Sequence, residues 1–168
     1  MLSNRERATR SKSERATPPG QARPALSLAI QEPFRDAALP IDRPRLRRWV
    51  RAALEHDARL VVRFVDADEG RALNRDYRRR DRPTNVLTFA YAQSPQVEAD
   101  IVICVPVVLA EARAAGITAG HHLAHLVVHG TLHAQGHEHE NEAQARAMER
   151  REAVILRRFG IADPFQRQ

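Results

Sequence analysis

A run of histidines in the last third of the chain is the feature that most constrains its fold. Seven of the eight histidines fall between His121 and His139, and three of them, His129, His133 and His139, follow the spacing H-x3-H-x5-H. On an α-helix His129 and His133 are one turn apart and share a face. Gly136 can adopt the left-handed conformation that ends a helix. The spacing therefore predicts a helix that ends near Gly136, with His139 returning toward the other two imidazoles.

These three histidines match the ligand set of a catalytic zinc site. Three neutral imidazoles leave a fourth position open, whereas structural zinc sites are closed by four ligands, usually cysteines. Cys104 is the only cysteine, which excludes a cysteine zinc cage and a disulfide framework. We therefore expect one Zn²⁺ ion bound by His129, His133 and His139. Incidental clustering of histidines and a non-catalytic metal clip are the alternatives that the residues leave open.

The same run differs at one position from the zinc-peptidase pattern H-E-x-x-H-x-x-G-x-x-H. The histidines and the glycine match, but Gly130 stands where the peptidases have the glutamate that acts as general base. Glycine has no side chain that could take a proton. The sequence therefore argues against a zinc peptidase or an amidohydrolase of that mechanism.

Length and composition favour one domain preceded by a basic arm. The 168 residues are enough for a single hydrophobic core. Residues 1–24 are rich in Ser, Thr, Pro and Arg without hydrophobic periodicity, which predicts a disordered arm, with residues 25–168 forming the domain. Six basic and two acidic residues in 1–23 supply most of the net charge of +6. Without a secretory signal or an apolar stretch long enough to span a bilayer, we expect a cytoplasmic protein.

Arginine accounts for 26 of the 27 basic residues. Guanidinium groups suit bidentate contacts with phosphate and stacking on bases, which is consistent with nucleic-acid binding. Biased codon usage is the alternative explanation. Five arginines lie between Arg75 and Arg82 and predict an anion-binding surface. The alternative at that segment is a solvated turn in which Asp76 and Asp81 pair with the arginines.

Hydrophobic periodicity predicts strands and helices in the order β-α-β-α-β-β-α-α-α. The expected strands cover residues 25–30, 60–65, 86–91 and 99–104, the last two as an antiparallel hairpin. The expected helices cover residues 42–54, 66–77, 106–116, a histidine helix starting at Thr118 or Gly120, and 140–159, whose apolar face includes Val154. This order defines an α+β domain. We expect a small mixed sheet of about four strands packed with about five helices, and a metal site on a helix and its C-terminal turn.

Other polar residues near the histidine run receive weaker assignments. His125 lies one turn before His129, and we expect it to pack or to support the site rather than to bind metal. His121 and His122, near the start of the helix, are expected to be solvated or to cap it. Asp100 is a candidate hydrogen-bond partner for a ligand histidine.

Three motifs follow one another along the chain. They are Asn74-x-x-Tyr77-Arg78-x-x-Asp81-x-Pro83-Thr84-Asn85-Val86-Leu87-Thr88-Phe89, then Ala99-Asp100-Ile101, then His129-Gly130-Thr131-Leu132-His133-Ala134-Gln135-Gly136-His137-Glu138-His139. Together they resemble the signatures of the bacterial YbeY family of rRNA maturation factors, over about residues 25–165. Ala99, Ala134 and the His137-Glu138 pair depart from the family's usual residues, and none of these departures removes an expected ligand.

The resemblance implies a single-strand-specific, metal-dependent endoribonuclease. Such an enzyme would act in 16S rRNA 3′-end maturation, assembly of the 30S ribosomal subunit and ribosome quality control, so the implied partner is RNA. The family's metal ligands fall on His129, His133 and His139, and its functional arginine falls on Arg78. His137 adds an imidazole that competes with His139 for the third ligand position. The principal alternative is a non-catalytic assembly factor, in which metal stabilises the fold and the arginines bind RNA.

Overall fold

The computed structural model describes residues 22–166, so the predicted arm at residues 1–24 lies almost entirely outside the described residues. The strands are β1 (Leu26–Gln31), β2 (Ala58–Val65), β3 (Val86–Ala92) and β4 (Val97–Cys104). The helices are α1 (Arg43–Ala53), α2 (Ala67–Arg78), α3 (Val105–Ala115), α4 (Ala119–Ala134) and α5 (Glu142–Arg157). This order confirms the predicted α+β class, with a mixed four-stranded sheet and five helices. Within the described part of the chain, no helix is long and apolar enough to cross a membrane.

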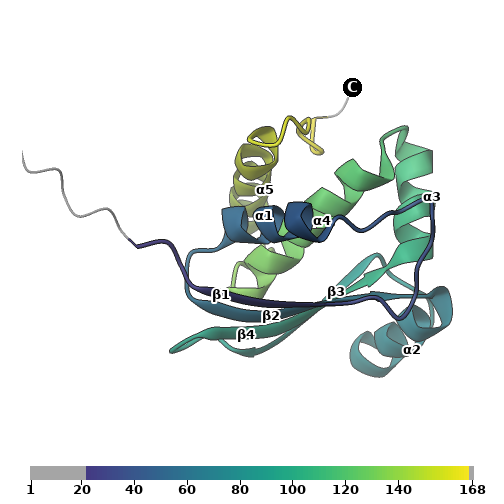
Figure 1. The fold of residues 1–168 in the computed structure, drawn as a ribbon, viewed down its shortest axis with the longest axis horizontal. Coiled ribbons are helices and arrows are strands. Elements are labelled where there is room, and N and C mark those ends of the chain that lie inside the picture. Colours follow the sequence, from purple (N-terminus) through teal and green to yellow (C-terminus); the bar gives the residue numbers. More distant parts are fainter. Residues whose placement is uncertain (1–21, 167–168) are drawn as a thin grey trace, which may run out of the picture.

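The four strands form one sheet in the order β1-β2-β4-β3. β1, β2 and β4 run parallel, and β3 pairs with β4 as the predicted antiparallel hairpin. Helices α1, α3, α4 and α5 lie on one face of the sheet, whereas α2 lies on the other (Figure 1). Strand β3 is therefore an edge strand with α4 on one side and the α2 side of the sheet on the other.

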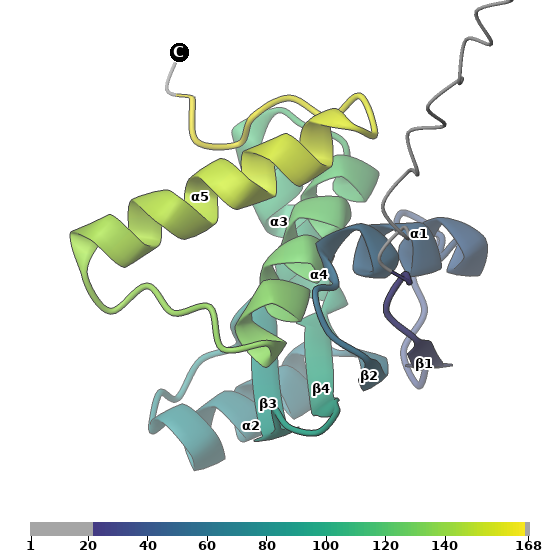
Figure 2. The ribbon, with the colours of Figure 1, turned by 90° about the vertical axis from the view of Figure 1, so that its left-hand side faces the viewer.

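Most of the hydrophobic core lies between the sheet and α4. Figure 2 shows α4 between α1 and α5, so this helix is covered on several sides. Alternate residues of β2 face it and are buried: Leu60, Val62 and Phe64. A smaller apolar cluster on the other face, under α2, contains Val65, Leu87, Val102 and Cys104.

Gly130 allows α4 to lie directly on the sheet. A Cβ atom at this position would lie 2.8 Å from Cγ2 of Ile101 and 3.2 Å from Oγ1 of Thr88, closer than packed side chains tolerate. Residue 130 therefore faces the sheet and has no room for a side chain. A glutamate general base cannot stand there, which argues further against the zinc-peptidase mechanism.

Both ends of α4 follow from local sequence. Thr118 caps the helix, because its side chain accepts a hydrogen bond from the backbone N–H of His121 at 3.1 Å. At the other end Gly136 has a φ angle of +91°, and the backbone N–H of His137 donates to the carbonyl of Leu132 at 3.2 Å. This is the predicted left-handed turn, and it directs the chain back toward the last turn of α4.

Helix α5 differs from the sequence prediction at its ends and on its buried face. It begins at Glu142 rather than at residue 140, because Asn141 caps it by accepting from the backbone N–H of Gln144 at 2.9 Å. It ends at Arg157 rather than at residue 159. Val154 was expected on the apolar face but is 51% exposed, whereas Glu152 is only 1% exposed. A carboxylate thus occupies a core position of this helix.

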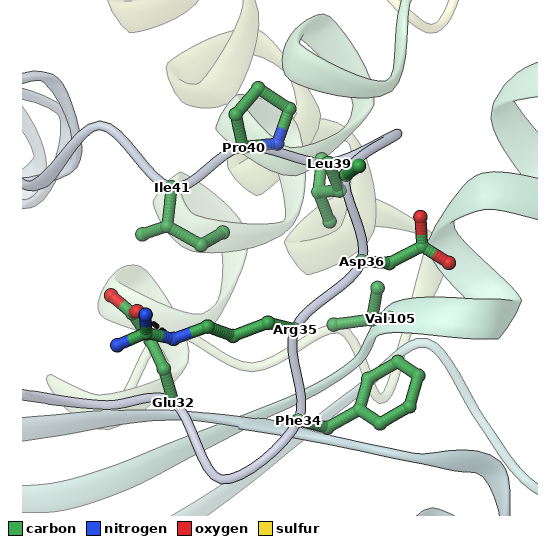
Figure 3. A pocket seen from close by; sticks show the side chains of 9 residues that line it. Glu32, Phe34, Arg35, Asp36, Leu39, Pro40, Ile41 and Val105 are labelled. Atoms are coloured by element: carbon green, nitrogen blue, oxygen red, sulfur yellow. Dashed lines mark ion pairs between the residues drawn. The ribbon is translucent and has the colours of Figure 1, made fainter.

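The loop between β1 and α1 folds over a pocket that none of the clustered histidines lines (Figure 3). Its volume is about 290 Å³. The Glu32 carboxylate is nearly buried there and pairs with Arg35 at 2.9 Å and with Arg43 at 3.1 Å. Glu32 therefore ties this loop to the start of α1.

Candidate metal centre

The fold brings the three predicted ligands together. His129 and His133 project from neighbouring turns of α4, and His139 arrives from the loop after Gly136. One ring nitrogen from each of the three histidines lies within 4.8 Å of the corresponding nitrogens of the others. Ring centroids are 4.5 Å apart for His129 and His133, and 4.8 Å apart for His133 and His139. The three imidazoles thus converge on one point.

Glu152 fixes the orientation of His129 from behind. One carboxylate oxygen lies 2.7 Å from Nδ1 of His129, and the other lies 2.9 Å from Nε2 of His125. This contact leaves Nε2 of His129 as its free nitrogen, and a carboxylate behind a ligand imidazole also increases its basicity. His125, Glu152 and His129 could also be considered ligands of a second ion. However, tetrahedral zinc ligands lie about 3.3 Å apart, so these shorter contacts are hydrogen bonds.

Electrostatics make the cluster suitable for a cation. Burial, followed by the neighbouring charges of His129 and His139, lowers the pKa of His133 to about 4, so its lone pair is available at neutral pH. Burial alone would raise the pKa of Glu152, but hydrogen bonds from His125 and His129 hold it at about 2. A set of imidazole nitrogens backed by one buried negative charge fits a divalent metal ion.

The turn that carries His139 is anchored through Gln135. Its Oε1 accepts from the backbone N–H of Glu55 at 2.7 Å, and its Nε2 donates to the carbonyls of Ala53 at 2.8 Å and Thr131 at 3.0 Å. The end of α4 is thereby attached to the end of α1. His137 interacts with the Glu55 carboxylate at 3.0 Å and lies outside the three-histidine group, which leaves His139 as the third candidate ligand.

A cavity of about 390 Å³ opens in front of the imidazoles. The residues that line it come from α4, the loop after it, the end of α2, the segment that leads into β3, and β3 itself: Arg78, Thr84, Asn85, Val86, Thr88, Ala90, His129, His133, Glu138 and His139. The expected functional arginine, Arg78, therefore lines the same cavity as the expected metal ligands, although about fifty residues separate them in the sequence.

Arg78 begins the arginine loop, which we define as residues 78–84. Asn74 is buried in α2 and donates from Nδ2 to the carbonyl of Arg82 at 2.7 Å, so it holds the far side of the loop. Arg79 has a φ angle of +56°, which ends α2 in the left-handed conformation. The motif residue Asn74 therefore shapes the loop that presents the arginines.

The two aspartates near this loop pair with arginines of α2. Asp81 binds Arg71 at 2.8 Å, and Asp76 binds Arg75 at 3.2 Å. Among residues 22–166, no acidic partner lies within ion-pair distance of the remaining four arginines of this segment: Arg78, Arg79, Arg80 and Arg82. The solvated-turn interpretation thus accounts for only one of the five arginines between Arg75 and Arg82, because Asp81 pairs with Arg71 outside that segment, and four positive charges remain available to an anion.

Two sequence assignments near the site need correction. Asp100 does not support a ligand histidine: it accepts from the Tyr91 hydroxyl at 2.9 Å, and the adjacent Ile101 is the residue that faces α4. Glu152 has the supporting role instead. His122 is not solvated, because it contacts the carboxylate of Glu111 at 2.7 Å and its side chain is 14% exposed.

Glu111 also fixes the start of β3. Its Oε2 accepts from Nδ2 of Asn85 at 2.9 Å, while Oδ1 of Asn85 accepts from the backbone N–H of Val86 at 2.7 Å. The backbone of the arginine loop thus enters the cavity wall at a fixed position. No spacing in the sequence relates Glu111 to Asn85.

An α+β domain in which three histidines and an arginine line one cavity belongs to the class of metal-dependent hydrolases. The sequence model of the family described as Endoribonuclease YbeY matches residues 34–160. Endoribonuclease YbeY of Methylibium petroleiphilum is 56% identical over 146 residues, which cover 86% of this chain and 97% of that relative. The chain belongs to the endoribonuclease YbeY family.

Two further comparisons agree with this assignment. Endoribonuclease YbeY of Thiobacillus denitrificans is 54% identical over 144 residues, which cover 84% of this chain and 97% of the relative. The solution structure of a Thermotoga maritima protein is 25% identical and superposes with a TM-score of 0.52, covering 84% of this chain and 100% of that one.

Proposed function

We propose that this protein is a zinc-dependent endoribonuclease that cuts single-stranded RNA in the bacterial cytoplasm. Its substrate is 16S rRNA of the 30S subunit, cut during 3′-end maturation and ribosome quality control. The observation that carries the proposal is the convergence of three imidazoles and Arg78 on one cavity. Membership of the endoribonuclease YbeY family supports RNA as the class of substrate.

His129, His133 and His139 would hold the zinc ion. Imidazole nitrogen suits Zn²⁺, whereas Mg²⁺ and Ca²⁺ prefer oxygen ligands. When bound, Zn²⁺ supplies a Lewis acid and lowers the pKa of a coordinated water toward neutrality. The Glu152 carboxylate stays ionised behind His129 and offsets the charge of the ion.

Arg78 acts on the phosphate. Its guanidinium can donate two parallel hydrogen bonds to phosphate oxygens and stabilise the negative charge that builds on them in the transition state. The other unpaired arginines of the loop bind flanking phosphates without reading the base sequence. The arginines therefore bind the RNA backbone from the α2 side of the cavity, and the histidines line the same cavity from the α4 side.

Cleavage by untagged protein tests this function, because an affinity tag of histidines would bind metal itself. Zinc-loaded protein should cut an end-labelled single-stranded RNA and leave the same RNA intact when it is annealed to its complement. A chelator should stop cleavage, and added zinc should restore it. The chemical form of the new 3′ ends, cyclic phosphate or free hydroxyl, identifies the 2′-OH or water as the nucleophile.

A matched pair of histidine variants completes the test. His129→Ala should bind no zinc and cut no RNA, whereas His121→Ala, on the same helix but outside the cluster, should keep both properties. If the wild type cuts no faster than His129→Ala while both bind RNA equally well, the protein is a non-catalytic assembly factor and the proposal is wrong.

A further inference from the structure

Both tyrosines of the chain lie together on the α2 side of the sheet. Tyr77 of α2 and Tyr91 of β3 are each 66% exposed, and they are two of only four large apolar side chains exposed within residues 22–166. The ring of Tyr77 packs edge-on against Phe89, with centroids 4.7 Å apart. Tyr91 follows Phe89 by two residues on β3, and its hydroxyl reaches Asp100 on the neighbouring strand. We call Tyr77, Phe89 and Tyr91 the aromatic patch.

A β-bulge and a hydrogen bond hold Tyr91 in its exposed position. Ala90 pairs with Ala99 and Ala92 pairs with Glu98, so Tyr91 is the extra residue on the edge strand. Bulges re-aim side chains and are frequent at sheet edges beside active sites. The Tyr91 hydroxyl donates to Oδ2 of Asp100 at 2.9 Å. An exposed ring that is already fixed loses little conformational entropy when a ligand stacks on it.

Strand β3 and the end of α2 connect the patch to the metal cavity. Thr88 and Ala90 line the cavity on one side of β3, while Phe89 belongs to the apolar cluster on the other side. Tyr77 and Arg78 are consecutive, with the ring in the patch and the guanidinium at the cavity. A strand of RNA that passes the β3 edge would therefore contact the Arg78 guanidinium through a phosphate and the neighbouring Tyr77 ring through a base.

We propose that the aromatic patch stacks unpaired bases of the RNA strand whose phosphate is bound at Arg78; this inference rests on the proposed endoribonuclease function. Every base has a π-face that stacks on an aromatic ring, but the face is accessible only when the base is unpaired. Asp100, which accepts from the Tyr91 hydroxyl, lies beside the patch and repels phosphate, so the backbone follows the arginine loop and the bases lie over the rings. Stacking thus selects single strands over duplexes.

The test compares substrate affinity with turnover. Tyr77→Ala and Tyr91→Ala in the zinc-loaded enzyme should each raise KM for a single-stranded RNA about tenfold, and the double variant about a hundredfold, since base–aromatic stacking is of that strength. The kcat value should change little, because neither ring lines the cavity. Tyr77→Phe keeps the ring and should keep KM, whereas Tyr91→Phe keeps the ring but loses the hydrogen bond to Asp100, so its KM should rise less than that of Tyr91→Ala. Val154→Ala removes an exposed apolar side chain of α5 and serves as the control.

Competitor oligonucleotides separate stacking from charge. Inhibition by a single-stranded DNA should weaken in the alanine variants, while inhibition by the same strand without bases should be unchanged. An unaltered KM in the double variant, with zinc content and circular dichroism of the wild type, overturns the proposal, as does equal weakening of both competitors. Wild-type enzyme that cuts no RNA would instead refute the proposed function, so the two failures are distinguishable.

Discussion

Two regions of the molecule line the same cavity, the histidine cluster of α4 and the arginine loop after α2, and they are stabilised in different ways. The cluster is backed by Glu152, which is 1% exposed and hydrogen-bonded on both oxygens. The arginine loop is exposed, and its nearby aspartates pair with Arg71 and Arg75 at the surface. Its shape comes from one buried amide, that of Asn74.

The difference reflects the size of the two ligands. A metal ion is small and needs donors fixed to within a fraction of an ångström, so its ligands are oriented by buried partners. A polyanion is long and exchanges its counterions for several cations at once, so exposed, unpaired arginines suffice. Buried hydrogen bonds orient the donors on the ion side of the cavity, whereas the arginines on the polymer side are exposed.

Replacing Arg78 should have the largest effect and separates the two regions. Arg78→Glu should lower kcat/KM for single-stranded RNA by about 10²- to 10³-fold, as expected when a group that stabilises transition-state charge is lost. Zinc content, measured by elemental analysis, should stay at one ion. Arg113→Glu makes the same charge change on the surface of α3 and should lower kcat/KM far less. A loss of zinc from Arg78→Glu would show that the two regions depend on each other.

Acid should destabilise the metal-free protein through the histidine cluster. The pKa of His133 is about 4 when folded and 6.5 ordinarily, so the unfolded chain binds more protons and stability falls as the pH drops from 6.5 to 4. The pKa of Glu152 is about 2 against an ordinary 4.5, so its contribution is lost between pH 4.5 and 2. Each loss is on the order of 3 kcal/mol. The free energy of unfolding, measured with urea across this pH range, tests the prediction. His133→Asn should flatten its pH dependence between pH 6.5 and 4.

Neutralising Glu152 should weaken metal binding more than it weakens the fold. Glu152→Gln can still accept from His129 and donate to the other tautomer of His125, so the variant loses mainly the charge. We expect a 10- to 100-fold lower zinc affinity, measured by competition with a chromophoric chelator. Glu142→Gln, on the same helix with a side chain that is 81% exposed, is the matched control. Equal zinc affinity in the two variants would contradict the role of the buried carboxylate.

The smallest effect is expected at the exposed ion pair of Arg71 and Asp81. Asp81→Asn breaks this pair, yet it should leave the melting temperature almost unchanged because solvent screens both charges. It also releases Arg71, so RNA binding at low salt should become slightly tighter. A clear loss of stability would mean that the arginine loop relies on ion pairs after all.

Local patterns in the sequence predicted most of the fold and much of the candidate site. Strand alternation, the cap at Thr118 and the turn at Gly136 depend only on residues close together in the sequence, so they can be predicted from it directly. His129 and His133 share a helix face for the same reason. Arg78 was assigned through the family resemblance, and in the structure it lines the cavity.

The supporting carboxylate could not be located in this way, because it depends on how distant elements pack. Glu152 lies on α5, 23 residues from its partner His129. One signal was present: Glu152 follows Met148 by one helical turn and precedes Leu156 by another, which places it on the buried face. Asp100, the candidate partner named from the sequence, lies on β4 and accepts from Tyr91 instead. Which face of β4 the helices cover, and hence where Asp100 points, is decided by the tertiary fold.

The unequal exposure of the three imidazoles has a kinetic consequence. His129 and His133 are partly buried on α4, whereas His139 is exposed on a turn that begins at Gly136. In the proposed zinc-loaded protein, opening of that turn would detach one ligand and leave the helical pair in place. We therefore expect exchange of the ion with its surroundings to start at His139, with the lifetime of the loaded state set by how often this short segment opens.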